Sequence, residues 1–471
     1  MISAGGFSQQ TLAVFGLARS GLSAARALMA GGARVLAWDD VPARRDAAAA
    51  AGITLADPDG LDWRAVAALV LSPGVPLTHP APHPVVARAR AAGVEVIGDV
   101  ELFLRSDPEA KTVAITGTNG KSTTTALVAH LLRSAGRPAE AGGNLGVPVL
   151  DLPPLEADGT YVVEMSSYQI DLTPSAGFDV AVLLNITPDH LDRHGSMAAY
   201  AAVKERLLQG PGIAVVGIDD EPGAAIAGRL AGASGRTLVR VTVGRRVLGA
   251  VSVAAGVLYD EQGEALADLG VCPGLPGEHN WQNAAAAFAV ARALGLESAA
   301  IARGLASFPG LAHRLERVAA AAGIRFINDS KATNAEAAAR ALACFETIYW
   351  IAGGRAKAGG IEALRPFFPR LRHAFLIGEA MEPFARTLGG AVPLTRAGTL
   401  ERALPAAFAL ARRDDIAGAV VLLSPAAASF DQFSDFEARG RAFTALAGAL
   451  AKAEAAAGEG AAGRPRAGGM R

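Results

Sequence analysis

The chain has 471 residues, which is too many for one hydrophobic core, and this length predicts about three domains. Lysine and arginine number 44 against 45 aspartate and glutamate residues, which excludes the global basic field that attracts nucleic acid or anionic lipid. The two cysteines, Cys272 and Cys344, exclude a disulfide framework. Without a leader-like start or an apolar run of about 18 residues, we expect a cytoplasmic protein that binds neither nucleic acid nor membrane.

Apolar strand-like runs alternate with alanine-rich helical stretches along the chain. In order, the runs are TLAVFGL, RVLAWDD, ALVLSPG, VEVIGD, TVAITG, YVVEMSS, VAVLLNI, RFINDS, TIYWIAGG, HAFLIGE and AVVLLSP. Repeated alternation of strand and helix predicts right-handed crossovers and largely parallel sheets. We therefore predict the α/β fold class, with functional residues in the loops at the carboxyl ends of the strands.

Two interruptions of this alternation predict the domain boundaries. The segment RSDPEAK ends at Lys111, where a new strand begins, and the segment FPGLAHRLE follows a helix. We predict domains at residues 1–105, 106–310 and 311–453. Residues 454–471 have too little apolar bulk to offset the entropy lost on ordering, which predicts a disordered tail.

The first domain carries a glycine turn after its first strand, in VFGLARSGLSAARAL. Gly16 and Gly21 fit a turn that cradles a diphosphate, although Ala18 stands where a dinucleotide fingerprint has its middle glycine. Asp39 and Asp40 end the next strand, where they could bond a ribose or a base edge. NAD is the alternative ligand for this turn, and a solvated turn is the alternative interpretation of the two aspartates.

The second domain opens with a shortened phosphate loop, GTNGKST, between an apolar strand and a helical run. Glycines allow backbone N–H groups to face a phosphate, Lys121 can reach the terminal phosphates, and the Ser122 hydroxyl can bind Mg²⁺. Ile115 stands where the commoner pattern has a glycine. The sequence predicts a nucleotide triphosphate site here, and a glycine turn that opens a buried helix is the structural alternative.

Acidic and imidazole side chains follow two further strands of the second domain. Glu164 ends an apolar strand, where a carboxylate needs a partner or a metal, and its strand is expected beside that of the phosphate loop. The alternative is that Glu164 caps the following turn. The segment LLNITPDHLDRHGS then gathers five polar side chains: Asn185, Asp189, His190, Asp192 and His194. His190 is predicted to bind a metal or phosphate, with a helix-capping or surface histidine as the alternative, and His194 could equally be a surface residue.

Three loops of the last domain carry hydroxyl and ammonium groups. The loop NDSKATN follows a strand, AGGRAKAGG carries Lys357, and SPAAASFDQFSDFEARG carries Ser424, Ser429 and Phe436. These groups suit a small dianionic acid better than an apolar ligand. The alternative for Asp329 and Ser429 is a role as helix N-caps.

With these motifs in this order, the chain resembles the Mur ligases, the peptidoglycan-precursor enzymes, and within them the branch that adds D-glutamate. The matching motifs are GTNGKST, GGNLG, EMSSYQ, ITPDHLDRHGS, LPGEHNWQNAAAA, AHRLE, NDSKATN, AGGRAKAGG and SPAAASFDQFSDFEARG. The resemblance implies an N-terminal Rossmann-like domain that binds a UDP substrate, a central P-loop-type ATPase domain and a C-terminal Rossmann-like domain that receives the amino acid. It also implies a cytoplasmic monomer.

The same resemblance implies a role for each matching residue. Contacts to the UDP substrate are implied for Gly16, Leu17, Ala18, Arg19, Ser20, Asp39, Asp40, Ser72, Asn144 and His190. ATP contacts are implied for Gly117, Thr118, Asn119, Gly120, Lys121, Ser122, Thr123, Asn280, Arg314 and Asp329. D-Glutamate contacts are implied for Lys331, Thr333, Lys357, Ser429 and Phe436.

The implied reaction is ATP-dependent synthesis of an amide between UDP-N-acetylmuramoyl-L-alanine and D-glutamate, through an acyl phosphate. The implied catalytic residues are Lys121, His190, Lys204 and Lys357. Two Mg²⁺ ions are implied, with the ligands Ser122, Thr123, Glu164, His190 and Lys204 as a carbamate. The alternatives are a ligase that uses L-glutamate or another acceptor, a UDP-sugar-binding protein without catalysis, and an NAD-dependent dehydrogenase.

Overall fold

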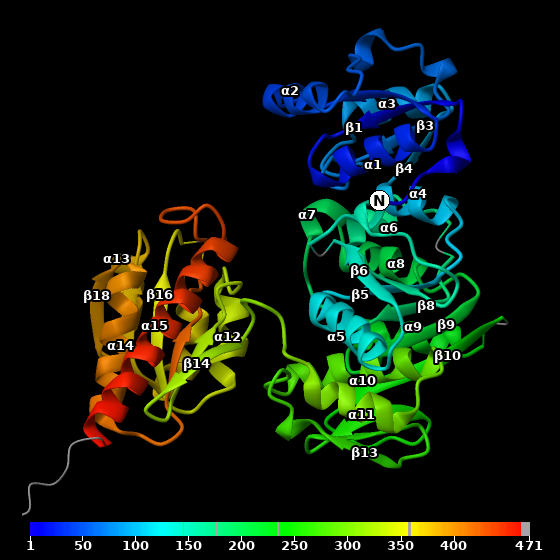
Figure 1. The fold of residues 1–471 in the computed structure, drawn as a ribbon. Helices are drawn as coiled ribbons and strands as arrows, with labels where there is room; N and C mark the ends of the chain where they lie inside the picture. The colour runs from blue at the N-terminus through cyan, green and yellow to red at the C-terminus, as the bar shows by residue number, and fades with distance from the viewer. Residues whose placement is uncertain (145, 176, 233–234, 357–358, 463–471) are drawn as a thin grey trace, which may run out of the picture. The chain divides into compact units, whose positions relative to one another are not determined.

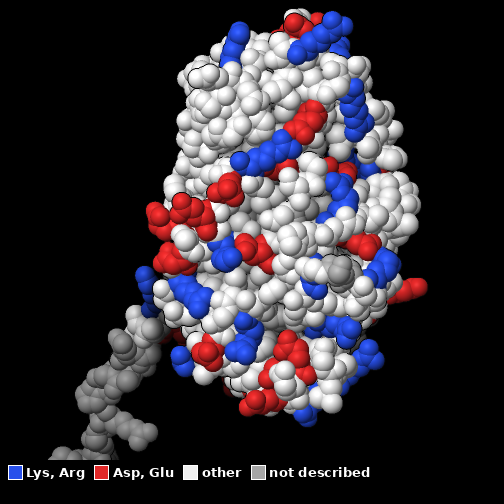
Figure 2. All heavy atoms as spheres, turned by 90° about the vertical axis from the view of Figure 1, so that its right-hand side faces the viewer, with Lys and Arg blue, Asp and Glu red and all other residues white. Residues whose placement is uncertain are grey.

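The computed structural model describes residues 1–144, 146–175, 177–232, 235–356 and 359–462. The chain forms two compact units, a first unit at Met1–Phe308 and a second unit at Pro309–Arg471 (Figure 1). Within the described ranges, no helix is long and apolar enough to cross a bilayer. On the face that Figure 2 shows, basic and acidic side chains are interspersed, in keeping with the balanced composition.

The first unit begins with a four-stranded parallel sheet in the order β2-β1-β3-β4. Its strands are short and nearly continuous apolar runs, as expected where helices cover both faces of a sheet. The strands are β1 Thr11–Phe15, β2 Arg34–Trp38, β3 Ala68–Leu71 and β4 Glu95–Ile97. The helices that connect and follow them are α1 Arg19–Ala30, α2 Pro42–Ala50, α3 Pro84–Ala91 and α4 Asp99–Arg105.

A second, nine-stranded sheet follows, in the order β13-β12-β11-β10-β9-β8-β5-β7-β6. Its strands from β6 across to β11 pair in parallel, and β12 and β13 add antiparallel pairs at one edge. The strands are β5 Lys111–Thr116, β6 Ala139–Gly143, β7 Thr160–Glu164, β8 Val180–Leu183, β9 Gly212–Gly217, β10 Arg236–Val243, β11 Ala250–Ala254, β12 Val257–Tyr259 and β13 Ala265–Asp268.

The helices of this region cover the nine-stranded sheet. Helices α5 and α10 lie side by side against it (Figure 1) and bury most of their alanine and leucine side chains in one apolar cluster with the strands. The helices are α5 Lys121–Ser134, α6 Ser167–Asp171, α7 Leu191–His194, α8 Met197–Arg206, α9 Glu221–Leu230, α10 His279–Ala293 and α11 Ser298–Ser307.

The first two sheets share a hydrophobic core. One apolar cluster extends from Leu28 in α1 through Phe103 in α4 to Tyr161 and Val163 in β7. The rings of Phe103 and Tyr161 meet edge to face with their centroids 5.2 Å apart. Because aromatic contacts of this kind bury large apolar areas, they explain why both sheets belong to one compact unit.

The second unit has a six-stranded sheet in the order β14-β15-β19-β16-β17-β18. Its pairs are parallel except for the antiparallel pair of β14 and β15. The strands are β14 Glu316–Ala321, β15 Ile324–Asn328, β16 Ile348–Gly353, β17 Leu371–Ile377, β18 Leu394–Gly398 and β19 Val420–Leu423. The helices are α12 Ala335–Ala343, α13 Met381–Leu388, α14 Leu400–Asp414 and α15 Phe436–Ala462, and apolar clusters fill both faces.

The predicted α/β class with largely parallel sheets is confirmed, and each predicted apolar run contains a strand. The sequence did not predict the strands β6, β9 to β13, β14 and β18, or the antiparallel pairs. The division into three domains stays a prediction, and it agrees with three sheets that form within residues 1–105, 106–310 and 311–453. The boundary between the two compact units follows Phe308, close to the predicted one.

The predicted disorder of residues 454–471 is wrong at its beginning. Helix α15 continues through this region to Ala462, and Glu454 accepts a hydrogen bond from Arg412 of α14 at 2.5 Å. Alanine has the highest helix propensity of all residues, so an alanine-rich end can extend a helix that is already anchored by packing. Residues 463–471 lie outside the described part of the chain.

Gly21 in helix α1 lies closer to the backbone of the preceding turn than any side chain would allow. A Cβ atom at this position would lie 1.8 Å from the carbonyl oxygen of Gly16. We predict that Gly21→Ala destabilises the first unit by about 1–3 kcal/mol, since the turn must move to admit a methyl group. Gly228→Ala is the matched control, because its Cβ would meet nothing within 4 Å, and it should not destabilise. Urea unfolding measures both, and equal effects would contradict the prediction.

Candidate active site

The phosphate loop leaves strand β5 at Gly117 and enters helix α5 at Lys121. Gly117 and Gly120 have φ angles of +155° and +86°. A Cβ atom on Gly117 would lie 2.9 Å from the Cβ of Leu184, and one on Gly120 would lie 2.1 Å from Oδ1 of Asn283. Conformation and space therefore both require glycine here, and the N-terminus of α5 adds positive potential at the turn.

Two lysines from different helices meet at this loop, as the sequence predicted that they would act together. Nζ of Lys121 donates to the carbonyl oxygens of Gly117 and Thr118, both at 2.9 Å. Nζ of the buried Lys204, from α8, donates to Oγ1 of Thr116 at 3.2 Å and to the same Gly117 oxygen at 3.1 Å. One carbonyl group thus accepts from two ammonium groups.

The environment of Lys204 disfavours its charge. Burial holds the pKa of the Lys204 ammonium group well below its usual range, the charge of Lys121 lowers it further, and Asp189 opposes the shift. A lysine with a lowered pKa exists more often as a neutral amine, which is nucleophilic.

Glu164 lies at the end of β7, beside the phosphate-loop strand, as predicted. It is 2% exposed and pairs with Ile115 of β5 in the parallel register. Its Oε1 accepts a 2.7 Å hydrogen bond from Nδ2 of Asn144, whereas its Oε2 is buried without a hydrogen-bond partner among the described residues. Ser166, not Glu164, caps helix α6, so the capping alternative for Glu164 is wrong. A buried oxygen of this kind needs a donor or a cation.

His190 and His194 belong to a cluster of rings above the loop. His190 has a φ angle of +52°, and its Nδ1 lies 3.1 Å from the hydroxyl of Tyr168. His194 is buried between the rings of Tyr168 and Tyr200, its Nε2 lies 2.9 Å from Oγ of Ser167, and burial lowers its pKa. The ring of Tyr200 lies 4.7 Å from Nζ of Lys204. The cluster thus connects His190 to Lys204, and the surface alternative for His194 is wrong.

Within the described residues, no group of three His, Cys, Asp or Glu side chains is arranged to hold a metal ion. The predicted metal ligands Glu164, His190 and Lys204 all surround the phosphate loop, but the Lys204 Nζ donates hydrogen bonds to Thr116 and Gly117, and an ammonium group cannot bind a cation. The magnesium site therefore stays a prediction.

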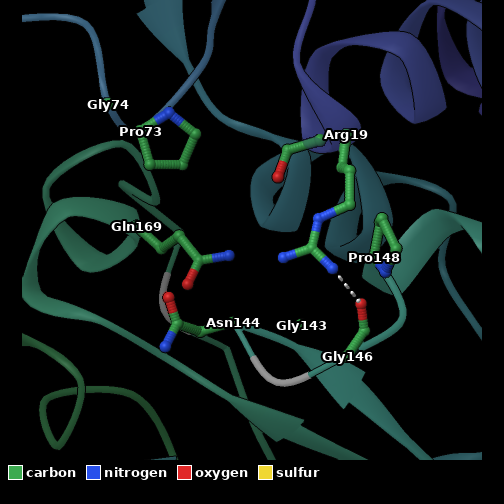
Figure 3. A pocket seen from close by; sticks show the side chains of 9 residues that line it. Arg19, Pro73, Gly74, Gly143, Asn144, Gly146, Pro148 and Gln169 are labelled. Carbon is green, nitrogen blue, oxygen red and sulfur yellow. Dashed lines mark hydrogen bonds between the residues drawn. The ribbon is translucent and has the colours of Figure 1, made fainter. Parts of the chain in front are cut away.

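A pocket opens between the first two sheets of the first unit, and Figure 3 shows its lining. The lining residues are Arg19, Ser20, Pro73, Gly74, Gly143, Asn144, Gly146, Pro148 and Gln169. Arg19, Ser20 and Asn144 were predicted to contact the UDP substrate, whereas Gln169 was not. Oε1 of Gln169 accepts from the N–H and the hydroxyl of Ser166, so its amide nitrogen faces the pocket opposite the guanidinium of Arg19 (Figure 3).

Asp39 holds the glycine turn that begins helix α1. It is buried and accepts hydrogen bonds from the N–H groups of Leu17 at 2.6 Å and Val41 at 2.8 Å, and from Arg44 at 3.3 Å. Burial alone would raise the pKa of Asp39, but the bonds from Val41, Leu17 and Arg44 outweigh it and lower the pKa. Asp39 is therefore ionised and holds the turn in place through these hydrogen bonds. The alternative of a solvated turn is wrong for Asp39.

The remaining predicted residues of the first sheet lie around this turn. A Cβ atom on Gly16, whose φ angle is +90°, would lie 2.5 Å from the Cβ of Ser72, so the two loops meet closely. Ala18 precedes the first residue of α1. Asp40 is exposed and contacts Nε2 of His83 at 3.0 Å.

Asn280 lies at the start of α10 and connects to the phosphate-loop helix through Asn283. Nδ2 of Asn283 donates to Oδ1 of Asn280 at 3.0 Å, and Oγ1 of Thr124 donates to Oδ1 of Asn283 at 3.2 Å. The sequence predicted Asn280 and missed Asn283, whose role depends on a partner 159 positions away in the chain.

In the second unit, Asp329 is buried at the end of β15. Its Oδ2 accepts from Oγ of Ser424 at 2.8 Å, and its Oδ1 accepts from the N–H of Leu315 at 3.3 Å. Burial raises the pKa of Asp329 to about 7, although these bonds and the charge of Arg314 oppose the shift. Asn334 caps α12, so the N-cap alternative for Asp329 is wrong.

The predicted amino-acid contacts lie in neighbouring loops of the same unit. Nζ of Lys331 lies 3.9 Å from the ring centroid of Phe436, a cation–π contact. The N–H of Thr333 bonds to the carbonyl oxygen of Lys331 at 2.8 Å, and Ser429 is buried in the loop before Phe436. Lys357, predicted as a catalytic and D-glutamate contact, lies outside the described residues.

Arg439 of α15 joins three loops, and the sequence did not point to it. Its guanidinium is buried and donates to the carbonyl oxygens of Ser330 at 2.8 Å, Ala427 at 3.1 Å and Gly353 at 3.5 Å. It also donates to Oγ of Ser330 at 3.0 Å. Burial lowers the pKa of Arg439 to about 10, so the side chain stays charged at neutral pH.

Comparison with known proteins identifies the family. The Mur ligase middle domain matches residues 115–291. A protein from Caulobacter vibrioides named UDP-N-acetylmuramoylalanine–D-glutamate ligase is 54% identical over 96% of this chain and 98% of its own length. The chain belongs to the Mur ligase family. A ligase of the same name from Phenylobacterium zucineum is 53% identical over 97% of this chain and 99% of its own length.

Solved structures agree on the fold of this Mur ligase. The UDP-N-acetylmuramate-alanine ligase of Thermotoga maritima matches with a TM-score of 0.56 and 18% identity, over 94% of this chain and 99% of that one. A MurF structure from Acinetobacter baumannii matches with a TM-score of 0.56 and 21% identity, over 78% of this chain and 87% of that one. At such identities these structures bear on the fold alone.

Asp329 of this Mur ligase should make the second unit sensitive to pH. Its folded-state pKa of about 7 exceeds the ordinary value of 3.8, so the native state keeps a proton that the unfolded chain releases. The stability from the protonated carboxyl is complete below about pH 4 and is lost as the pH rises to about 7, by as much as about 4 kcal/mol. The Asp329→Asn side chain does not titrate. The free energy of unfolding of this variant should therefore rise relative to that of the wild type as the pH increases across this range. Amide hydrogen exchange in β15 and β19 measures the difference, and a pH-independent difference would contradict it.

Proposed function

We propose that this Mur ligase joins D-glutamate to UDP-N-acetylmuramoyl-L-alanine with consumption of ATP. The observation that carries the proposal is the identity of 54% to a ligase of that name over nearly the whole length of both chains. The phosphate loop with its two lysines adds chemical support, because a dinucleotide-dependent dehydrogenase or a non-catalytic UDP-sugar-binding protein requires neither lysine. Cytoplasmic location and a monomeric state are part of the same proposal.

The chemistry that this site must perform is activation of a carboxylate. A carboxylate is a poor electrophile, and its oxygen is a poor leaving group. Transfer of the γ-phosphoryl group of ATP to a carboxylate oxygen breaks the bond to the β-phosphate oxygen, releases ADP and gives an acyl phosphate. The amine of D-glutamate then attacks the acyl carbon, the bond to the phosphate oxygen breaks, and the amine loses a proton as the amide forms.

The phosphate loop is proposed to bind and orient the triphosphate. In the present conformation Lys121 bonds to the loop carbonyls of Gly117 and Thr118, positions from which its flexible stem can turn to a phosphate. Positive charge fixed in place before the reaction stabilises the charge that develops on the transferred group. Thr118, Asn119, Gly120, Ser122, Thr123 and Asn280 complete the proposed contacts in the first unit, and Arg314 and Asp329 those in the second.

Magnesium ligands are proposed to surround the same loop. Oε2 of Glu164 is buried without a partner in the described chain, and His190 lies in the ring cluster that leads to Lys204. The neutral amine of Lys204 can add CO₂ and lose a proton, which converts it to an anionic oxygen ligand. These residues, with Ser122 or Thr123, suit two Mg²⁺ ions, which supply charge neutralisation when bound.

The UDP substrate is proposed to bind at the N-terminus of α1 and in the pocket of Figure 3. Gly16, Leu17, Ala18 and Ser20 present a turn suited to the diphosphate, and the guanidinium of Arg19 adds charge. Asp39 keeps the turn in shape, and Asp40 and Ser72 lie next to it. Asn144 and His190 are proposed to contact the part that carries the reacting carboxylate.

D-Glutamate is proposed to bind among the loops of the second unit. Lys331 provides an ammonium group held against Phe436, and Thr333 and Ser429 provide hydroxyls. Lys357, from the AGGRAKAGG loop, is proposed as a further cation for the second carboxylate. Arg439 donates hydrogen bonds to backbone carbonyl groups of all three loops and would thereby fix their positions relative to one another.

The proposal predicts release of ADP that requires both UDP-N-acetylmuramoyl-L-alanine and D-glutamate. Lys121→Ala should lower kcat by about 10²–10³, the usual loss for one preorganised charge stabiliser. Lys111→Ala, at the exposed opposite end of β5, is the control and should keep activity. A coupled ADP assay measures both. Equal turnover with L-glutamate would leave a Mur-like ligase with another acceptor, and no turnover with either would contradict the proposal.

The proposed carbamate makes a separate prediction about Lys204. Lys204→Ala should lose activity, and formate or acetate should restore part of it by supplying the missing oxygen ligand. Lys204→Arg fills the site with a cation and should not be rescued. Initial rates against acid concentration measure the effect, with wild-type enzyme as the control for ionic strength. Activity of Lys204→Ala without added acid would contradict a metal-ligand role.

A further inference from the structure

Asn185 lies two residues after the end of β8, beside the point where the phosphate loop leaves the neighbouring strand β5. Its carbonyl oxygen accepts a 2.9 Å hydrogen bond from the N–H of Thr118, so the backbone ladder continues into the loop. Its side chain extends the ladder: Oδ1 accepts from the N–H of Asn119 at 2.9 Å, and Nδ2 donates to the carbonyl oxygen of Asn119 at 3.2 Å. The amide side chain thus pairs with both backbone groups of one loop residue.

A second amide fixes the orientation of the first. Nδ2 of Asn185 also donates to Oε1 of Gln282 in α10 at 2.8 Å, and Nε2 of Gln282 donates to Oδ2 of Asp219 at 3.4 Å. A backbone N–H can only donate, and an ionised carboxylate can only accept. The chain of bonds from Asn119 through Asn185 and Gln282 to Asp219 therefore has one direction, set at both ends.

Asp219 is itself held in place by the C-terminal end of β10. Its Oδ1 accepts from Oγ1 of Thr242 at 2.6 Å, and both of its oxygens accept from the N–H of Val243 at 3.1 Å. The series of hydrogen bonds thus begins at β10, passes through Gln282 of α10 and ends at Asn119 in the phosphate loop. Along this path the loop conformation depends on residues that are distant in sequence.

We propose that Asn185 is a positioning residue that holds the phosphate loop in its nucleotide-binding conformation, and that Gln282 and Asp219 hold the Asn185 amide in the orientation this requires. The inference rests on the proposed function, because it concerns the ATP site. It assigns Asn185 a role in ATP binding that does not require contact with any substrate.

The first test is the affinity of the full-length protein for a non-hydrolysable ATP analogue, measured by calorimetry. Asn185→Ala removes both bonds to Asn119 and should weaken binding by about ten-fold to a hundred-fold. The KM for ATP should rise while the KM for UDP-N-acetylmuramoyl-L-alanine stays constant. Thr187→Val is the matched control: its hydroxyl contacts the Asn119 side chain at 3.4 Å, and its loss should leave affinity unchanged. Thermal unfolding of each variant checks that it folds.

The second test uses the donor-to-acceptor direction of the hydrogen bonds that run from Asn119 through Asn185 and Gln282 to Asp219. Asn185→Asp places an oxygen opposite the Asn119 carbonyl and Oε1 of Gln282, so Gln282 must turn and present its oxygen to Asp219. Asp219→Asn alone places an N–H₂ group against Nε2 of Gln282 or against the N–H of Val243. Both single variants should bind the analogue more weakly. In the double variant, the amide introduced at position 219 can donate to the turned Gln282, so the protein should bind more tightly than Asn185→Asp alone.

These outcomes separate the inference from a simple charge effect and from the proposed function. If electrostatic repulsion of phosphate alone decided affinity, Asp219→Asn would bind as tightly as the wild type or more tightly, which would overturn the inference. Unchanged affinity in a folded Asn185→Ala variant would overturn it as well. A wild-type protein that does not bind the analogue would instead overturn the proposed ATP-dependent function.

Discussion

The carbonyl oxygen of Gly117 accepts hydrogen bonds from two lysines, and much of the central site depends on this arrangement. Lys121 reaches it from the helix that the loop begins, and Lys204 reaches it from a different helix that packs under the ring cluster. Two ammonium groups at one acceptor repel each other, so the arrangement is favourable only while one of them is neutral or while anions approach. An anion that binds at this loop would offset the repulsion between the two ammonium groups, so the loop favours anionic ligands.

This preference explains why the surrounding residues are polar yet buried. Glu164 is the acidic residue next to the loop, and one of its carboxyl oxygens already accepts a hydrogen bond from Asn144. The remaining oxygen is buried and has no hydrogen-bond partner among the described residues. Since an uncompensated buried carboxylate destabilises a fold, the position is better explained by a ligand than by packing. The same reasoning applies to Lys204, whose burial has no benefit for the apolar core.

Local patterns predicted the parts of the structure that local physics decides. Apolar runs such as those around Val113 and Trp350 became parallel strands, and the glycine turns at Gly16 and Gly117 adopt backbone angles that require glycine. Strand β6, with the sequence AEAGG, has low strand propensity and forms through its pairing with β7. The roles of Gln169, Asn283 and Arg439 depend on partners far away in the chain, for which a single sequence carries no signal.

Asn144 connects the pocket between the first two sheets to the phosphate loop. It lines the pocket, its backbone N–H bonds to the Glu164 carbonyl oxygen at 2.9 Å, and its side chain bonds to the Glu164 carboxylate. Glu164 in turn pairs with Ile115, two residues before Gly117. The contacts of Asn144 and Glu164 thus run without interruption from the pocket lining to the strand that carries the phosphate loop.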